Sequence, residues 1–191
     1  KFLFGSNIFM LGQCRTPEEN AAYARLFSDL LNYATLPFYW WAYEPVHGQP
    51  AYAATDQIVA WCRANNVTTK GHPLAWNWMD PAWLPTDPQA AMDAQVRRIG
   101  ECVTRFRGEI ESWDVVNEAT EFERPDTVAQ SPILTEAIRR MGVPAYVRAA
   151  FRPALNLSLA RDFRHGQTAR TAALPQWVGD GSHPCRSGPD P

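Results

Sequence analysis

The sequence predicts an α/β fold in which helices surround a parallel sheet. Over residues 1–150, short apolar runs alternate four times with amphipathic helical patterns, an order typical of strand–helix units. Hydrophobic residues make up 46% of the 191 residues, enough to build a buried core. No apolar run approaches the roughly 20 residues of a membrane-spanning helix. We therefore expect one domain, or part of one, without a membrane partner.

Each expected element has a local signal. Strands are expected where aliphatic and aromatic residues cluster, namely at residues 2–9, 33–41, 67–76 and 110–116. Helices are expected to begin at capping side chains, namely Thr16, Thr55, Asp87 and Ser131. The clearest apolar stripe follows Asp87 and runs from Met92 to Phe106 before Gly108. Pro144 is expected to interrupt or end the last helix.

Two architectures contain such a sheet. A dinucleotide-binding fold would carry a glycine-rich turn after its first strand, and this sequence has none there. Polar and aromatic residues instead follow the expected strands, where barrel enzymes build their active sites. We therefore predict that residues 1–150 form about the first four βα units of a TIM (β/α)8 barrel. A complete barrel takes roughly 250 residues.

Residues 151–191 differ in composition from the rest. They contain five prolines and four glycines, and no Glu, Lys, Ile or Tyr. We interpret them as an irregular tail, either disordered or translated from a shifted reading frame. The first residues, from Lys1, show no charged-then-apolar leader, so no signal peptide is recognised in this chain.

Charge and cysteine content exclude several classes of function. The formal net charge is −2, which gives no basic footprint for nucleic acid. The four cysteines form no CxxC pair, which argues against a zinc site and a dense disulfide framework. We expect no metal and no cofactor.

The sharpest motif is Trp113-Asp114-Val115-Val116-Asn117-Glu118. An apolar strand here ends in an amide and a carboxylate. Glycosidases need two carboxylates, one of which is protonated and donates to the leaving oxygen. A glutamate beside apolar residues suits that role, and Asn117 could bind a sugar 2-hydroxyl. The alternative is an ordinary solvated loop, since Glu121 and Glu123 follow closely.

A second motif runs from Lys70 to Trp76. His72 stands between Gly71 and Pro73 at the end of an expected strand, an unusual place for a histidine that only packs in the core. Seven of the eight tryptophans lie between Trp40 and Trp113. Such tryptophans either pack in a core or stack on the apolar faces of sugars.

Residues 3–150 resemble glycoside hydrolase family 10, the endo-β-1,4-xylanases with (β/α)8 barrels. The two motifs, with Glu44-Pro45-x-x-Gly48 and Pro81-x-Trp83, occur in the order and spacing of that family. The resemblance implies that Glu118 is the general acid/base. It also implies that Asn117, His72 and Trp76 line the subsite of the sugar whose bond is cut. The implied partner is a polysaccharide, xylan or a related β-1,4-glycan, and the implied location is secreted or periplasmic.

The sequence departs from the family in two places. Residues 35–41 lack the Asn, Glu and Lys that follow the family's second strand, so another retaining β-glycosidase is an alternative. The family's nucleophile, a glutamate on a late strand, is expected to be absent from this chain. Glu121 and Glu123 share the loop of Glu118, and Glu136 lies on an outer helix, so we reject all three as substitutes. A non-catalytic carbohydrate-binding fragment is the other alternative, and a half-barrel with open edges is expected to self-associate.

Overall fold

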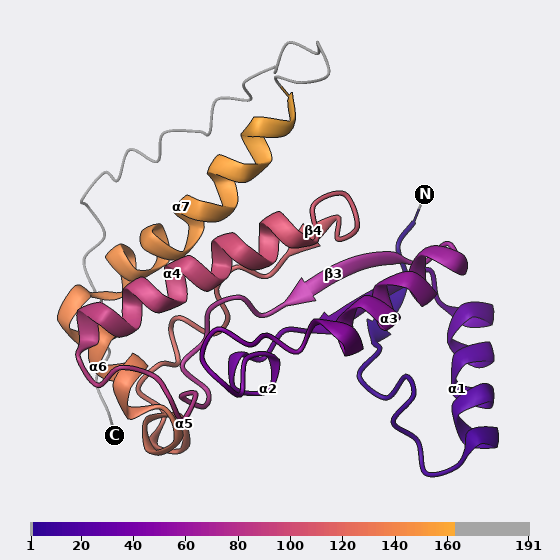
Figure 1. Ribbon diagram of the computed structural model, residues 1–191, viewed down its shortest axis with the longest axis horizontal. Coiled ribbons are helices and arrows are strands. Elements are labelled where there is room, and N and C mark those ends of the chain that lie inside the picture. Colours follow the sequence, from indigo (N-terminus) through magenta and orange to yellow (C-terminus); the bar gives the residue numbers. More distant parts are fainter. Residues whose placement is uncertain (1, 163–191) are drawn as a thin grey trace, which may run out of the picture.

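The computed structural model describes residues 2–162 of the chain (Figure 1). Within them, four parallel strands form one sheet in sequence order: β1 (Gly5–Asn7), β2 (Tyr33–Pro37), β3 (Thr68–His72) and β4 (Ser112–Trp113). Helices follow every strand, so the predicted strand–helix alternation is confirmed. Each observed strand is shorter than the apolar run that predicted it, because the run also includes residues of the segment that follows the strand.

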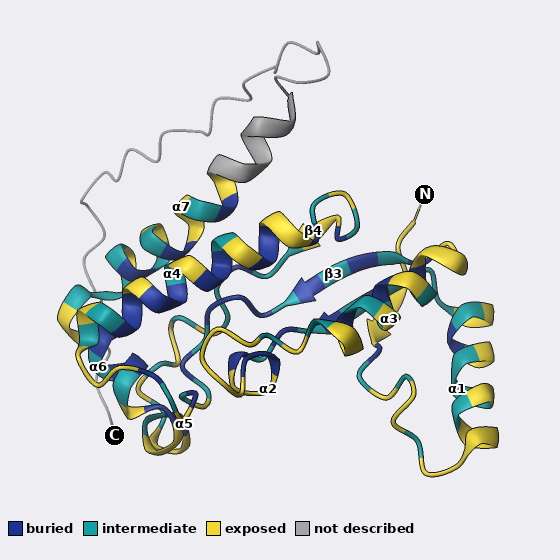
Figure 2. Ribbon diagram, viewed as in Figure 1, coloured by how far each residue is buried: buried dark blue, intermediate teal, exposed yellow. Residues whose placement is uncertain are grey.

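Helices lie between successive strands as crossovers, and three more follow the last strand of the described residues. The helices are α1 (Pro17–Leu30), α2 (Trp40–Tyr43), α3 (Tyr52–Ala64), α4 (Pro88–Arg105), α5 (Pro125–Gln130), α6 (Pro132–Met141) and α7 (Val143–Asp162). Helix α4 packs against both α6 and α7. Figure 2 shows a continuous buried face on α4, whereas most of α1 is exposed and only Phe27 of that helix is buried. None of the described helices is long and apolar enough to cross a membrane.

The core lies between the sheet and the helices. Along β2 and the residue after it, Ala34, Leu36 and Phe38 are fully buried and alternate with half-buried neighbours. This period of two is that of a strand with one face in the core. The ring of Phe38 packs edge-on against Trp113, with the ring centroids 4.8 Å apart. The main core therefore reaches the ends of the strands, where the site motifs begin.

Two expected helix starts are confirmed by their caps. The Thr16 hydroxyl accepts from the Glu19 amide at 3.2 Å, and the Asp87 carboxylate accepts from the Ala90 amide at 2.8 Å. The expected start at Thr55 was wrong, because α3 begins at Tyr52 and buries Thr55 within it. The Tyr52 ring packs on Tyr43 at 5.6 Å, and this tertiary contact extends the helix toward its N-terminus.

Two expectations about the end of the described chain also need correction. Residues 151–162 are not irregular but continue α7, so the expected boundary at residue 150 lies inside a helix. Tyr146, Ala150 and Ala154 are buried at a spacing of four residues, so one helical stripe crosses that boundary. Gly142, with φ of 80°, ends α6, and Pro144 stands in the first turn of α7 instead of ending a helix. Residues 163–191 of the expected tail lie outside the described residues.

Candidate active site

The two site motifs run side by side beyond the ends of β3 and β4. The amide of Leu74 donates to the Asp114 carbonyl at 2.9 Å, and the amide of Ala75 donates to the Val115 carbonyl at 2.8 Å. The Asn117 amide then donates back to the Ala75 carbonyl at 2.9 Å. This ladder carries parallel pairing past the strands. The segment that bears His72 and Trp76 is therefore fixed against the segment that bears Asn117 and Glu118.

Asp114 forms a polar triad with Lys70 and His72 next to this ladder. The Asp114 Oδ2 atom is 2.8 Å from Lys70 Nζ and 2.9 Å from His72 Nδ1. Burial works to raise the pKa of Asp114, but the hydrogen bonds and charges of Lys70 and His72 outweigh it and hold that pKa below its usual value. The carboxylate contacts the Nδ1 atom of His72 and so fixes the orientation of the imidazole ring.

Three half-buried aromatic rings stand beside His72, and we call Tyr39, Trp76 and Trp78 the aromatic cluster. The Tyr39 ring lies edge-on to His72, with the centroids 5.9 Å apart, and it lies 6.1 Å from Trp76. Trp76 and Trp78 stack with centroids 4.9 Å apart and planes 14° apart. Flat aromatic faces of this kind bind the apolar faces of sugar rings.

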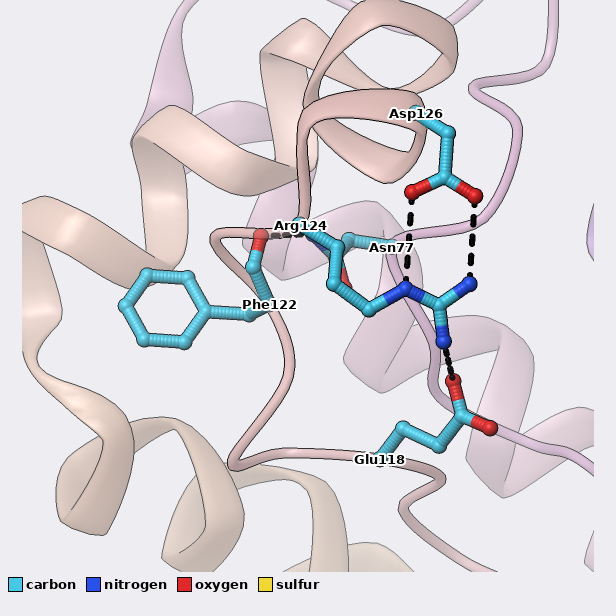
Figure 3. Close-up of polar contacts among 5 residues, drawn as sticks. All are labelled: Asn77, Glu118, Phe122, Arg124 and Asp126. Carbon is cyan, nitrogen blue, oxygen red and sulfur yellow. Dashed lines mark hydrogen bonds and ion pairs between the residues drawn. The ribbon is translucent and has the colours of Figure 1, made fainter.

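Glu118 begins a tight turn. Its φ is 48°, in the left-handed region, and its carbonyl accepts from the Glu121 amide at 2.8 Å. Its side chain is 40% exposed and meets Arg124, with Nη1 3.4 Å from Oε2 (Figure 3). Arg124 also donates to both carboxylate oxygens of Asp126, at 3.4 and 3.1 Å.

Glu118 also acts electrostatically on the aromatic cluster. Burial raises the pKa of Tyr39, and the negative charge of Glu118 raises it further. Both effects disfavour ionisation of the Tyr39 phenol. The rim thus combines a carboxylate, an imidazole and flat aromatic rings.

The other glutamates of this region make separate contacts. Glu123 pairs with Arg139 at 2.9 and 2.5 Å, and Glu136 pairs with Arg140 at 2.8 Å. The hydrogen bond from Arg139 lowers the pKa of Glu123. Neither ion pair includes Glu118. Within the part of the chain that the structure describes, no group of three or more His, Cys, Asp or Glu side chains could hold a metal ion.

The sequence patterns did not indicate three polar residues of this region, the buried Asn77 and Arg98 and the half-buried Asp80. The Asn77 amide donates to the Phe122 carbonyl at 2.9 Å, which holds the loop after Glu118 (Figure 3), and to the Thr135 hydroxyl of α6 at 2.9 Å. A polar residue inside an apolar stretch, as in Trp76-Asn77-Trp78, was the available signal.

Comparisons with known proteins identify the family and the fold of this chain. The glycosyl hydrolase family 10 model matches residues 13–160. Endo-1,4-beta-xylanase A of Caldicellulosiruptor sp. (strain Rt8B.4) is 28% identical over 121 residues, covering 56% of this chain and 17% of that protein. Endo-1,4-beta-xylanase 5 of Arabidopsis thaliana is 32% identical over 88 residues, covering 44% of this chain and 16% of that protein.

The fold is also that of solved structures. The structure of GH10 from Paenibacillus barcinonensis superposes with a TM-score of 0.62 at 24% identity. The alignment covers 82% of this chain and 48% of that one, so the chain spans about half the length of that structure. The predicted partial (β/α)8 barrel is thereby confirmed. Because the family model covers most of the sequence, from the segment after β1 to near the end of α7, the chain belongs to glycosyl hydrolase family 10.

Proposed function

We propose that this chain carries the acid/base half of a retaining endo-1,4-β-xylanase-type glycoside hydrolase. The polysaccharide substrate would be xylan or a related β-1,4-glycan. The observation that supports this most is the backbone ladder between Leu74 and Asn117. It brings a carboxylate, an imidazole and an aromatic face to one rim of a parallel sheet, the rim at which barrel enzymes act.

In this proposal Glu118 acts twice. It first protonates the glycosidic oxygen while a second carboxylate, about 5–5.5 Å away, attacks the anomeric carbon. It then takes a proton from the water that releases the sugar. Trp76 would stack on the sugar at the cleaved bond, while Asn117 and His72 would bind its hydroxyls. We do not assign the second carboxylate to Glu121, Glu123 or Glu136.

In this proposal the contact with Arg124 gives way during the reaction, because the carboxyl group of Glu118 has to approach the glycosidic oxygen. Both side chains are 40% exposed and their nearest atoms are 3.4 Å apart. Exposed pairs of this kind contribute little to stability, because water screens both charges. A bound sugar can therefore displace Arg124, which keeps its two hydrogen bonds to Asp126.

The test separates binding from hydrolysis. Tryptophan fluorescence during titration with xylotriose reports binding, which Asn117→Ala and Trp76→Ala are expected to weaken. Release of reducing sugar from xylan reports hydrolysis. We expect it only when strands five to eight of a family 10 relative are added in trans, because the nucleophile is expected to come from there. Glu118→Gln should abolish this hydrolysis, whereas the matched change Glu121→Gln should retain it. Hydrolysis that survives Glu118→Gln contradicts the proposal.

A second candidate is carbohydrate binding without hydrolysis, which the parallel stack of Trp76 and Trp78 favours. Binding to insoluble xylan that Trp76→Ala removes, with no hydrolysis in any mixture, would support it. A third reading, another retaining β-glycosidase, rests on the aromatic segment after β2. A panel of aryl β-glycosides given to the complemented protein would separate it from a xylanase.

A further inference from the structure

Arg98 of α4 is a charged side chain in the centre of the core. It is 1% exposed, and none of the ion pairs in the described part of the chain includes it. Its Nη1 atom donates to the Leu74 carbonyl at 2.5 Å, and its Nη2 atom donates to the Phe38 carbonyl. One guanidinium therefore holds two backbone carbonyls that belong to different strand ends.

These two carbonyls occupy particular positions in the chain. Phe38 immediately precedes Tyr39, and Leu74 lies two residues before Trp76. The guanidinium plane fixes the relative position of its donors, so it also fixes the spacing of the two segments. The aromatic cluster stands on these segments, and Tyr39, Trp76, Trp78 and Arg98 all line one small cavity.

Burial of the Arg98 guanidinium is unfavourable for folding stability when it is considered alone. Burial lowers the pKa of Arg98, because the charged form loses its hydration. The nearby carboxylate of Glu44 is instead bound by the Trp40 indole at 3.0 Å and the Gly48 amide at 2.8 Å. Aromatic rings give partial compensation, since Trp40 and Tyr43 lie 5.5 and 5.4 Å from the guanidinium carbon. The Nε atom has no hydrogen-bond partner. Apolar residues of similar size often replace buried charges without loss of stability.

We propose that Arg98 is a positioning residue for carbohydrate binding, which sets the distance and angle between Tyr39 and the Trp76–Trp78 stack. It touches no substrate and acts through the two carbonyls. The proposal rests on the proposed function for the identity of the ligand. Its structural part, the placement of Tyr39 relative to the stacked Trp76 and Trp78, can be tested without any ligand.

The test compares the full chain with Arg98→Met and Arg98→Lys. Arg97→Met is the matched control, because Arg97 is the neighbouring residue but is exposed and pairs with Glu101 at 3.5 Å. Circular dichroism reads the exciton couplet that arises from coupling among the rings of the aromatic cluster, that is, between Tyr39 and the stacked Trp76 and Trp78 indoles. Titration with xylotriose reads affinity, and thermal unfolding shows that each variant is folded at the assay temperature.

Arg98→Met should reduce the couplet and weaken xylotriose binding about tenfold, the scale of one lost aromatic stacking contact. Its unfolding midpoint should change little, because relief of a buried charge opposes the loss of two hydrogen bonds. Arg98→Lys should keep part of both signals, because its ammonium can donate hydrogen bonds but lacks the fixed planar arrangement of donors that a guanidinium has. Arg97→Met should change neither signal.

A normal couplet and normal affinity in Arg98→Met would overturn the proposal. So would a large fall in its unfolding midpoint with the couplet intact in the folded protein, since Arg98 would then be only a stabilising residue. If the unsubstituted chain fails to bind xylotriose, the proposed function fails, and the couplet alone decides the role of Arg98.

Discussion

Replacing Gly71 with alanine places a methyl group inside the ring of Trp113. A Cβ atom built on Gly71 lies 2.3 Å from both Cε3 and Cζ3 of that ring, because the two residues are directly paired between β3 and β4. The ring cannot simply retreat, since it packs against Phe38 at 4.8 Å. Overpacking of this kind costs about 2 kcal/mol. For a domain of this size, the unfolding midpoint should fall by roughly 4–8 °C.

Gly100→Ala is the control for this prediction. A Cβ atom there lies 3.8 Å from its nearest neighbour, the Cβ of Pro153, and the position is inside α4. Alanine in a helix is about 0.5–1 kcal/mol more favourable than glycine, so this variant should melt slightly above the unsubstituted chain. Both are measured by thermal unfolding under one set of conditions. A Gly71→Ala variant that melts as high as the unsubstituted chain would refute the reasoning.

Three further substitutions are expected to have distinct effects. The pKa of Asp114 is held low by its partners, so its contribution to stability is present above the unfolded-state value of about 3.9 and is lost as the pH falls below it. In urea unfolding at pH 3 to 7, Asp114→Asn should therefore lose less stability on acidification, and an identical pH dependence would count against the triad. Asp80 accepts from the Ile133 amide at 2.7 Å and caps α6, so Asp80→Ala should lower the free energy of unfolding by about 1–2 kcal/mol. Leu30 is 69% exposed and lines an apolar groove of about 420 Å³ beside β1. We expect the chain to self-associate in sedimentation experiments. Leu30→Lys should then reduce self-association more than the control substitution Val46→Lys does, and equal effects would place the contact elsewhere.

Local signals predicted the elements best where one side chain determines a helix start. Thr16 and Asp87 cap their helices as their sequence context indicates, because the hydrogen bond forms within one turn. Thr55 has the same chemistry, but the packing of Tyr52 on Tyr43 starts that helix earlier. A capping residue therefore marks a helix start only where no tertiary contact extends the helix.

The continuation of α7 was hidden by small side chains. Ala150 and Ala154 are buried as deeply as larger core residues, yet alanine adds little to an apolar stripe, and Pro153 within the helix suggests an end. The site motifs were easier to recognise because their residues follow one another along the chain. Arg98 could not be recognised in this way, since its partners Phe38 and Leu74 are 60 and 24 residues away.

The parallel order of the strands separates the two ends of the sheet. Residues of the candidate site follow β2, β3 and β4, whereas the connections that enter these strands, around residues 32, 66 and 110, lie at the opposite rim. Surface connections tolerate changes in length and composition better than the elements they join. An affinity tag, a fluorophore or a link to a solid support at that rim would therefore leave the rim of the candidate site open. Variants of the chain can be immobilised at that rim, and the ligands that each variant binds can be compared.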